Sequence, residues 1–286
     1  MTSSRVHPWK IRRSWKAALS AAIALASAPT PARADPTRAE NEIEAPRPPP
    51  AYRLDPAIDL SIVVIAGATA STFFFADQWG SPPSCAPLCD GSHLNFLDRP
   101  AAGLYDRRWS NIGDIATAST LALPPLVVLL DEGTKNGLND DLVLLEAGLV
   151  SSAIQVSTAY AVPRPRPRVY GERAPLSERT DAIAARSFYS GHVANAMAVS
   201  VAGLRTFQRL DKPVVGWLVL GAGVAGSGVI GVSRVLGGSH FPTDVLFGAV
   251  TGTGIGLVMP AVHGSNVRVV PLGAASGSGV AMLGAW

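Results

Sequence analysis

Three clusters of polar and basic residues stand out in a chain that is otherwise poor in charge. Of its 286 residues, 48% are hydrophobic and only 16% are charged. The first cluster is the segment RPRPR, with Arg164, Arg166 and Arg168. Prolines keep such a segment extended, and each guanidinium can bind two phosphate oxygens at once. By itself, however, a basic proline-rich loop is more often a solvated connector.

The second cluster is the sequence Ser190-Gly191-His192, which opens a long apolar segment. The first turn of a helix presents free N–H groups and a positive dipole end, and glycine lets an anion approach the backbone closely. An anion-binding site is one interpretation. The other is that Ser190 is only the N-cap of the helix.

The third cluster extends from Ser233 to Asp244 and reads SRVLGGSHFPTD. Arg234 can bind phosphate, and His240 precedes Asp244 by four residues. This spacing lets a carboxylate hold one imidazole nitrogen while the other nitrogen faces a substrate. A lone His–Asp pair is more often structural, but here it comes with an arginine and two glycines.

Six apolar segments must position these clusters. Each is longer than an ordinary strand, so we expect helices and an all-α protein. The segments are 60–76, 115–130, 142–162, 188–204, 213–233 and 245–262. The second cluster begins the fourth segment, and the third cluster leads into the sixth.

The apolar segments leave two settings open. A membrane span needs about 20 apolar residues, and most of the uncharged runs lie near the lower limit of that range. They fit either a membrane bundle or the core of a compact soluble bundle. Gly248, Gly252 and Gly256 are four residues apart. That spacing places a small face on the last helix, which allows a neighbouring helix to pack closely.

The first 34 residues have the layout of a secretory signal peptide: a basic stretch, an apolar stretch and an Ala-x-Ala site. Residues 35–56 are rich in proline and are predicted to be a linker. The leader holds six basic residues and no acidic one, which leaves 18 basic against 21 acidic residues in the rest. The formal charge of +3 therefore gives no reason to expect nucleic acid as a partner.

The sequence features that indicate export agree only in part with the membrane topology that the basic loop indicates. Cys85 and Cys89 are the only cysteines, and a local disulfide or two free thiols would both suit them. Arg205, Arg209 and Lys212 form a basic loop typical of the cytoplasmic side of a membrane. In a bundle of six spans, the first helix would then start inside, whereas a cleaved leader would place its start outside.

Residues 263–286 form either a β-hairpin or a frayed tail.

The three clusters, in this order, resemble the type 2 phosphatidic acid phosphatase superfamily, which includes bacterial acid phosphatases and vanadium haloperoxidases. That pattern is Lys-x6-Arg-Pro, Pro-Ser-Gly-His and Ser-Arg-x5-His-x3-Asp. The third motif matches completely. In the second, Tyr189 replaces the proline, and in the first, Ala159 replaces the lysine. The missing lysine argues against haloperoxidase chemistry, which needs a full cage of positive charge around vanadate.

The resemblance implies a six-helix domain over residues 57–262 that hydrolyses phosphomonoesters without a metal or other cofactor. His240 would be the nucleophile, Asp244 would orient it, and His192 would act as acid and base. The resemblance assigns phosphate binding to Arg166, Ser190, Gly191 and Arg234, with Arg164 or Arg168 as candidates to replace the missing lysine.

The expected substrate is a lipid phosphate or a small phosphate ester. The active site would face the periplasm in an exported protein, either membrane-bound or soluble. Two alternatives remain: an inactive or weak member that binds phosphate or lipid head groups, and a phosphotransferase that uses an alcohol in place of water.

Overall fold

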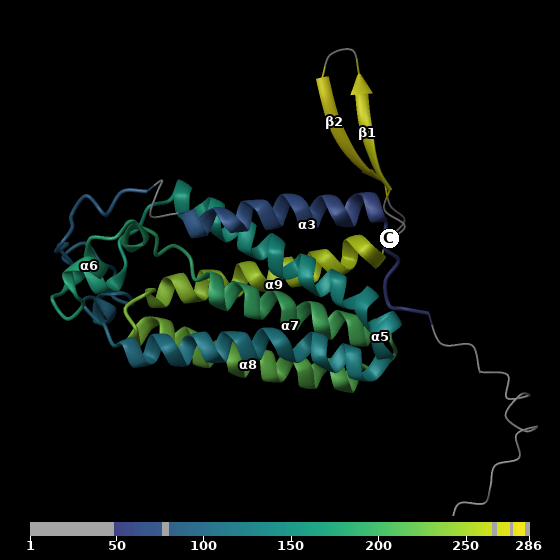
Figure 1. Ribbon diagram of the computed structural model, residues 1–286, viewed down its shortest axis with the longest axis horizontal. Helices are drawn as coiled ribbons and strands as arrows, with labels where there is room; N and C mark the ends of the chain where they lie inside the picture. The colour runs from purple at the N-terminus through teal and green to yellow at the C-terminus, as the bar shows by residue number, and fades with distance from the viewer. Residues whose placement is uncertain (1–48, 76–79, 265–267, 275–276, 284–286) are drawn as a thin grey trace, which may run out of the picture. The chain divides into compact units, whose positions relative to one another are not determined.

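The computed structural model describes residues 49–75, 80–264, 268–274 and 277–283. The predicted signal peptide, 1–34, and most of the predicted linker lie outside them. Long helices dominate and run side by side (Figure 1). They are α3 (Pro56–Ser71), α5 (Arg107–Ala161), α7 (Gly191–Arg209), α8 (Pro213–Leu236) and α9 (Pro242–Gly264). The expected all-α fold is confirmed.

Helix α5 contains two of the six predicted helices. Gly133 interrupts it with φ 72° and ψ 176°, a conformation that favours glycine. The range α5 therefore comprises two helices that meet at a kink at Gly133, and these are the segments predicted at 115–130 and 142–162. The other four predicted segments correspond to α3, α7, α8 and α9.

Short elements fill the connections between the long helices. They are η1 (Thr72–Phe75), η2 (Arg99–Ala101), η3 (Pro167–Tyr170), α6 (Leu176–Arg179) and η4 (Ala182–Ala185). After α9, strands β1 (Arg268–Ala274) and β2 (Gly277–Leu283) form an antiparallel pair, with Arg268 opposite Leu283. A hairpin is therefore present in the C-terminal tail.

The helices begin at residues suited to starting them. Asp55 caps α3 by accepting hydrogen bonds from the N–H groups of Ala57 and Ile58, at 3.0 and 3.3 Å. Asp106 caps α5 in the same way. Proline occupies the first position of α3, α8 and α9, where its missing N–H costs nothing.

Helix α7 lies at the centre and packs against α5, α8 and α9. Its contact with α9 depends on the predicted glycine face. A Cβ added to Gly248, Gly252 or Gly256 would lie 2.5, 2.1 or 2.5 Å from a carbonyl oxygen of α7 or of its N-cap residue. Only glycine allows the two backbones to approach this closely, as the spacing predicts.

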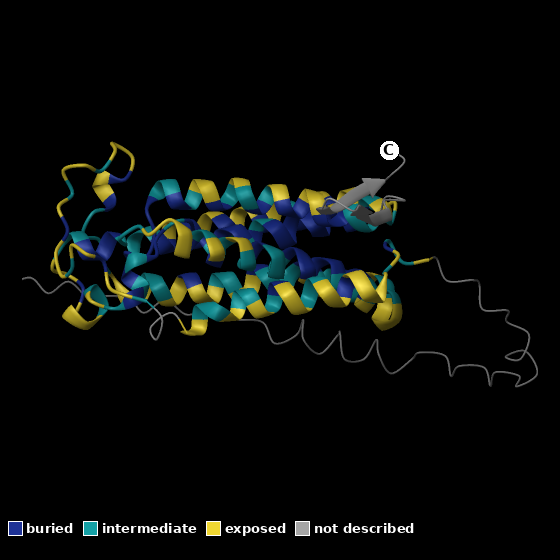
Figure 2. Cartoon of the chain, turned by 90° about the horizontal axis from the view of Figure 1, so that it is seen from above, coloured by how far each residue is buried: buried dark blue, intermediate teal, exposed yellow. Residues whose placement is uncertain are grey.

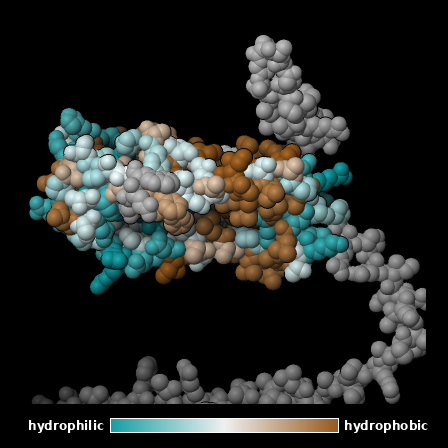
Figure 3. Space-filling model, turned by 45° about the horizontal axis from the view of Figure 1, so that its top comes forward, coloured by the Kyte–Doolittle hydropathy of each residue, from teal (hydrophilic) through white to brown (hydrophobic). Residues whose placement is uncertain are grey.

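Apolar side chains cover much of the outside of the bundle. Figure 2 shows buried residues along the inner faces and exposed ones along the outer faces, and Figure 3 shows apolar side chains gathered over the helical part. Leu60, Leu130 and Val250 are 65%, 77% and 73% exposed. The segments Pro56–Phe75, Arg107–Ala161, Pro213–Leu236 and Pro242–His263 are long and apolar enough to cross a membrane. This surface suits lipid, and the protein is a membrane protein.

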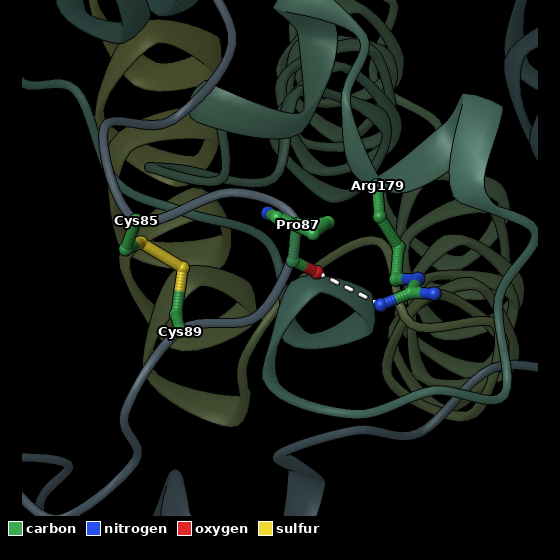
Figure 4. Close-up of a disulfide and its surroundings, with 4 residues drawn as sticks. All are labelled: Cys85, Pro87, Cys89 and Arg179. Atoms are coloured by element: carbon green, nitrogen blue, oxygen red, sulfur yellow. Dashed lines mark hydrogen bonds between the residues drawn. A yellow bond between two sulfur atoms is a disulfide. The ribbon is translucent and has the colours of Figure 1, made fainter.

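The loop between α3 and α5 is fastened at one end of the bundle. A disulfide joins Cys85 to Cys89, and Arg179 donates a hydrogen bond of 3.0 Å to the carbonyl oxygen of Pro87 (Figure 4). The N–H of Cys89 donates to the carbonyl oxygen of Val169 at 3.0 Å. The loop is thereby held against the segment that follows the arginine cluster.

The end of the predicted linker contacts the bundle. The N–H groups of Ala51 and Tyr52 donate to the carboxylate of Asp140 at 2.9 and 3.2 Å, and the Tyr52 hydroxyl is 3.1 Å from Thr206 Oγ1. Tyr52 is only 1% exposed. The packed domain therefore begins several residues before α3.

Candidate active site

The three sequence clusters meet around one cavity of about 700 Å³. Its polar wall includes Arg166, Gly191, His192 and His240, one or more residues from each cluster. These come from the loop after α5, the first turn of α7 and the turn before α9. The apolar wall comes mainly from α3, η1 and α5, with Val63, Gly67, Ala70, Phe73, Phe74, Leu149 and Val156.

The His240 ring is held by a backbone carbonyl. Its Nδ1 lies 2.6 Å from the carbonyl oxygen of Ser187, and the residue is only 3% exposed. A carbonyl can only accept, so we assign the ring hydrogen to Nδ1, which leaves the lone pair on Nε2. Burial and the positive charge of Arg166 hold the pKa of His240 well below 6.5, so its imidazole is neutral at neutral pH.

The sequence led us to expect a direct contact between Asp244 and His240. The structure does not have this contact. Asp244 Oδ2 is 4.0 Å from His240 Nδ1, beyond hydrogen-bond distance. The same oxygen instead accepts from Ser187 Oγ at 2.5 Å and from the N–H of Phe241 at 2.8 Å, while Oδ1 binds Arg164. Asp244 therefore positions Ser187, and the carbonyl of Ser187 positions the imidazole.

Asp114 of α5 links the other two charged groups of the site. Its Oδ1 accepts a hydrogen bond from Arg234 Nη2 and lies 3.9 Å from His192 Nε2. Burial in the cavity wall and the positive charge of Arg234 lower the pKa of His192, while Asp114 opposes this effect. Asp114 was not identified from the sequence, because an aspartate in an apolar helix has no motif.

Three buried donors at the site have no hydrogen-bond partner among the described residues: Arg166 Nε, Ser190 Oγ and Arg234 Nε. Ser190 does not cap α7 with its side chain, although its position allows it, so the simple N-cap interpretation fails. Burial and the charges of Arg168 and Arg234 lower the pKa of Arg166 to about 9. Unpaired donors beside crowded positive charge and a helix N-terminus suit an anion.

The side chains of Arg164 and Arg168 bind groups that lie outside the cavity. Arg164 donates to Asp98 Oδ2 at 2.6 Å and also binds Asp244. Arg168 donates to the carbonyl oxygen of Glu178 at 2.9 Å and to Asp181 Oδ2 at 3.0 Å. Neither arginine lines the cavity, so neither supplies the charge of the missing lysine.

The position of the missing lysine is buried in the bundle and does not face the cavity. Ala159 is 2% exposed in α5 and does not line the cavity. One turn earlier, Gln155 lines the cavity, and its Nε2 donates to the carbonyl oxygen of Tyr189 at 3.1 Å. Gln155 and the buried Asp98, like Asp114, are residues that sequence reasoning missed. Neither belongs to a recognisable pattern.

Comparisons with known proteins agree with the motifs. Residues 142–268 match the model of the PAP2 superfamily. One solved structure that matches is described as the first transmembrane PAP2 type phosphatidylglycerolphosphate phosphatase from Bacillus subtilis. It is 19% identical, with 71% of this chain and 94% of that chain covered and a TM-score of 0.38, a likeness too weak to argue from. No curated protein matches the chain. The region that carries all three motifs, residues 142–268, is therefore similar to the PAP2 superfamily.

Proposed function

We propose that the protein is a metal-independent phosphatase that hydrolyses phosphomonoesters through a phosphohistidine intermediate. The observation that carries this proposal is the cavity itself. It is lined by a neutral, oriented His240, by His192 and by Arg166, whose buried Nε has no partner among the described residues. Ser190 and Arg234, which also carry an unpartnered donor, adjoin this lining through Gly191 and through Asp114. The superfamily match supports a phosphatase of the lipid-phosphatase type.

In the first step, His240 Nε2 attacks phosphorus, so that a P–N bond forms while the bond to the leaving oxygen breaks. The Ser187 carbonyl accepts a hydrogen bond from Nδ1–H and stabilises the positive charge that develops on the ring. His192 donates a proton to the leaving oxygen. Its pKa is lowered in the free protein, and the negative charges of a bound phosphate oppose that lowering.

In the second step, His192 accepts a proton from water while the water oxygen attacks phosphorus and the P–N bond breaks. Arg166, Arg234, Ser190 Oγ and the N–H of Gly191 would stabilise the three equatorial oxygens in both steps. These donors act where charge is spread over the transferring group, and the unpaired ones need not give up a protein partner.

A lipid phosphate is the substrate class that the cavity supports best. Apolar side chains of α3 and α5 form the wall next to the polar end, and Phe73 and Phe74 of η1 also line the cavity. A single-tailed or two-tailed lipid could place its head group at His240 and its acyl chains along this wall. A small water-soluble ester would use only the polar end.

Features at the two opposite ends of the bundle support the proposal that the active site faces the periplasm. The disulfide-bearing loop is held beside the arginine loop at the active-site end, as expected for an oxidising compartment. Arg205, Arg209 and Lys212 lie at the other end of α7, as expected for the cytoplasmic side.

The test is turnover by purified protein in detergent. The substrates are p-nitrophenyl phosphate and a phosphatidic acid, and the control is His240→Ala. We expect release of phosphate from both by the wild type only, with preference for the lipid, and an acid-labile phosphate adduct on His240 after rapid quenching. An adduct elsewhere, or equal rates in wild type and control, would overturn the mechanism.

A second candidate function is supported by Ala159. The family's phosphate-binding lysine is absent, and no described basic side chain takes its place in the cavity. The chain would then bind phosphate or lipid head groups without useful turnover. Phosphate binding by wild type and not by Arg166→Ala, together with no turnover, would establish this alternative.

A further inference from the structure

A second cluster of ionisable side chains lies inside the helical bundle, apart from the cavity. Asp59 of α3, Glu146 of α5 and His263 of α9 come together, although the first and last are 204 residues apart. His263 Nε2 lies 3.0 Å from Asp59 Oδ1 and 2.8 Å from Glu146 Oε2. Asp59 and Glu146 are 3% and 0% exposed. Ionisable groups inside a membrane bundle are costly and usually serve a purpose.

The hydrogen bonding of His263 leaves its other nitrogen facing only oxygen acceptors. Nδ1 lies 2.9 Å from the carbonyl oxygen of Met259, so we assign a hydrogen to Nδ1. In the neutral ring, Nε2 then presents a lone pair to two carboxylates. A lone pair and carboxylate oxygens repel one another unless a cation lies between them. A backbone carbonyl that holds the second imidazole nitrogen is also the usual support of a metal-binding histidine.

The charges of the cluster do not balance unless a further positive charge, a metal ion or an added proton, is bound. Even if His263 carries a proton, two carboxylates and one imidazolium leave a net charge of −1 in the bundle. No Lys or Arg of the described residues forms an ion pair with either carboxylate, and Asp59 Oδ2 and Glu146 Oε1 are buried without a hydrogen-bond partner. An uncompensated buried charge is strongly unfavourable. A divalent cation with a neutral His263 makes the sum zero.

We propose that Asp59, Glu146 and His263 bind a divalent transition metal ion, best represented by Zn²⁺. One imidazole nitrogen and two carboxylates are ligands that zinc accepts, and their atoms all lie within 4.8 Å of one another. Ligand atoms around tetrahedral zinc are separated by about 3.3 Å, so the two contacts of His263, at 3.0 and 2.8 Å, need to open by only a few tenths of an ångström.

The ion would be a clasp and would take no part in phosphoryl transfer. It would connect α3 to α5 and α9, whereas α3 by itself packs mainly against α5. In the apolar segment Pro56–Phe75, which contains α3, only 11% of the most apolar stretch is buried. Because Val63, Gly67 and Ala70 of α3 form part of the cavity wall, the clasp would keep that wall in place.

The test uses the full chain, purified in detergent through a tag without histidine and stripped with a strong chelator. Metal content is measured by mass spectrometry and thermal unfolding is followed with and without added Zn²⁺. Wild type should take up one zinc per chain and unfold at a temperature several degrees higher, since an ion that binds only the folded state stabilises it. His93→Ala is the matched control, because His93 is exposed in a loop outside the cluster, and it should behave like wild type.

His263→Ala should bind zinc at least about tenfold more weakly and lose the thermal shift, since it removes one of three ligands. If that variant does not fold, Asp59→Asn replaces it, and Co²⁺ added to stripped wild type gives visible absorption bands when it is bound by nitrogen and oxygen. The proposal is overturned if wild type takes up neither ion, if zinc produces no thermal shift, or if the folded variant binds as wild type does. Any of these results would mean that protons alone balance the cluster.

Discussion

The chemistry of the site depends on which nitrogen of each histidine is free. Ser187 holds Nδ1 of His240 through its backbone carbonyl, and its side chain acts on the imidazole only indirectly, through the bond to Asp244 that positions this backbone. His192 is the only other described histidine in the cavity. The proposed roles of nucleophile and proton donor therefore follow from position, and each can be tested by a single substitution.

The proton-donor role of His192 predicts a dependence on the leaving group. His192→Ala should lower kcat/KM for an alkyl phosphate by about 10²–10⁴-fold, the usual worth of a general acid. The loss on p-nitrophenyl phosphate should be much smaller, because its leaving group departs without a proton. His240→Ala should be inactive on both esters. Equal losses on both esters in His192→Ala would remove the acid role.

The lowered pKa of His240 predicts that its Nε2 remains nucleophilic below pH 6.5. Burial and Arg166 disfavour the charged ring, so protonation should occur only well below that pH. The measurement is the rate at which diethyl pyrocarbonate modifies His240, followed by peptide mass spectrometry without substrate. In Arg166→Gln the midpoint should move upward towards 6.5. A wild-type midpoint at or above 6.5 would contradict the assignment.

At the scale of elements, buried ion pairs join the loops that carry the motifs. Asp98, from the loop between α3 and α5, accepts hydrogen bonds from Arg164 Nη2 at 2.6 Å and from Thr243 Oγ1 at 2.7 Å. Arg164 in turn binds Asp244 at the start of α9. Three segments distant in sequence are thereby fixed around the turn that presents His240.

Arg164 and Arg166 should therefore respond differently to substitution. Arg164→Ala leaves two buried carboxylates without their cation, which we expect to cost about 3 kcal/mol of stability, seen as easier unfolding in detergent. Arg166→Ala should unfold like wild type but bind phosphate at least about tenfold more weakly, the worth of one charge-assisted contact. If Arg164→Ala were as stable as wild type and lost phosphate binding, Arg164 would be a phosphate ligand after all.

The packing of α9 on α7 gives a second prediction at this scale. In Gly252→Ala the new Cβ would lie 2.1 Å from the backbone oxygen of Ala194, so the helices must separate, at a cost of about 2 kcal/mol. Gly254→Ala is the matched control in the same helix, because its Cβ would meet nothing within 4 Å. We expect lower stability and lower activity only in Gly252→Ala. Similar behaviour of the two variants would show that this contact is not tight.

For the whole molecule, the proposed orientation places the two ends of α7 on opposite sides of the membrane. Ser92 is exposed in the disulfide-bearing loop and Arg205 is exposed near the other end. In sealed right-side-out vesicles, Ser92→Cys should react with a membrane-impermeant maleimide, whereas Arg205→Cys should react only after detergent is added. The reverse pattern would place the active site in the cytoplasm.

The helices, the motifs and the glycine face could all be predicted from the amino-acid sequence. Helix segments follow from apolar length, and Gly248, Gly252 and Gly256 share a face because four residues make about one turn. His240, Ser190 and Arg166 could be identified because each belongs to a short pattern with chemical meaning. All of these signals are local, so they do not depend on how the helices pack.

Which side chains meet across different helices and loops could be seen only in the folded protein. It showed that Asp244 binds Ser187 rather than His240, that Arg164 binds Asp98, and that Asp59 and His263 lie together. In each case the partners are between 57 and 204 residues apart. Helical periodicity gives the face that a side chain occupies, but not which neighbour covers that face. The choice depends on close packing, such as that between α7 and α9, which brings backbones together at distances that no local pattern sets.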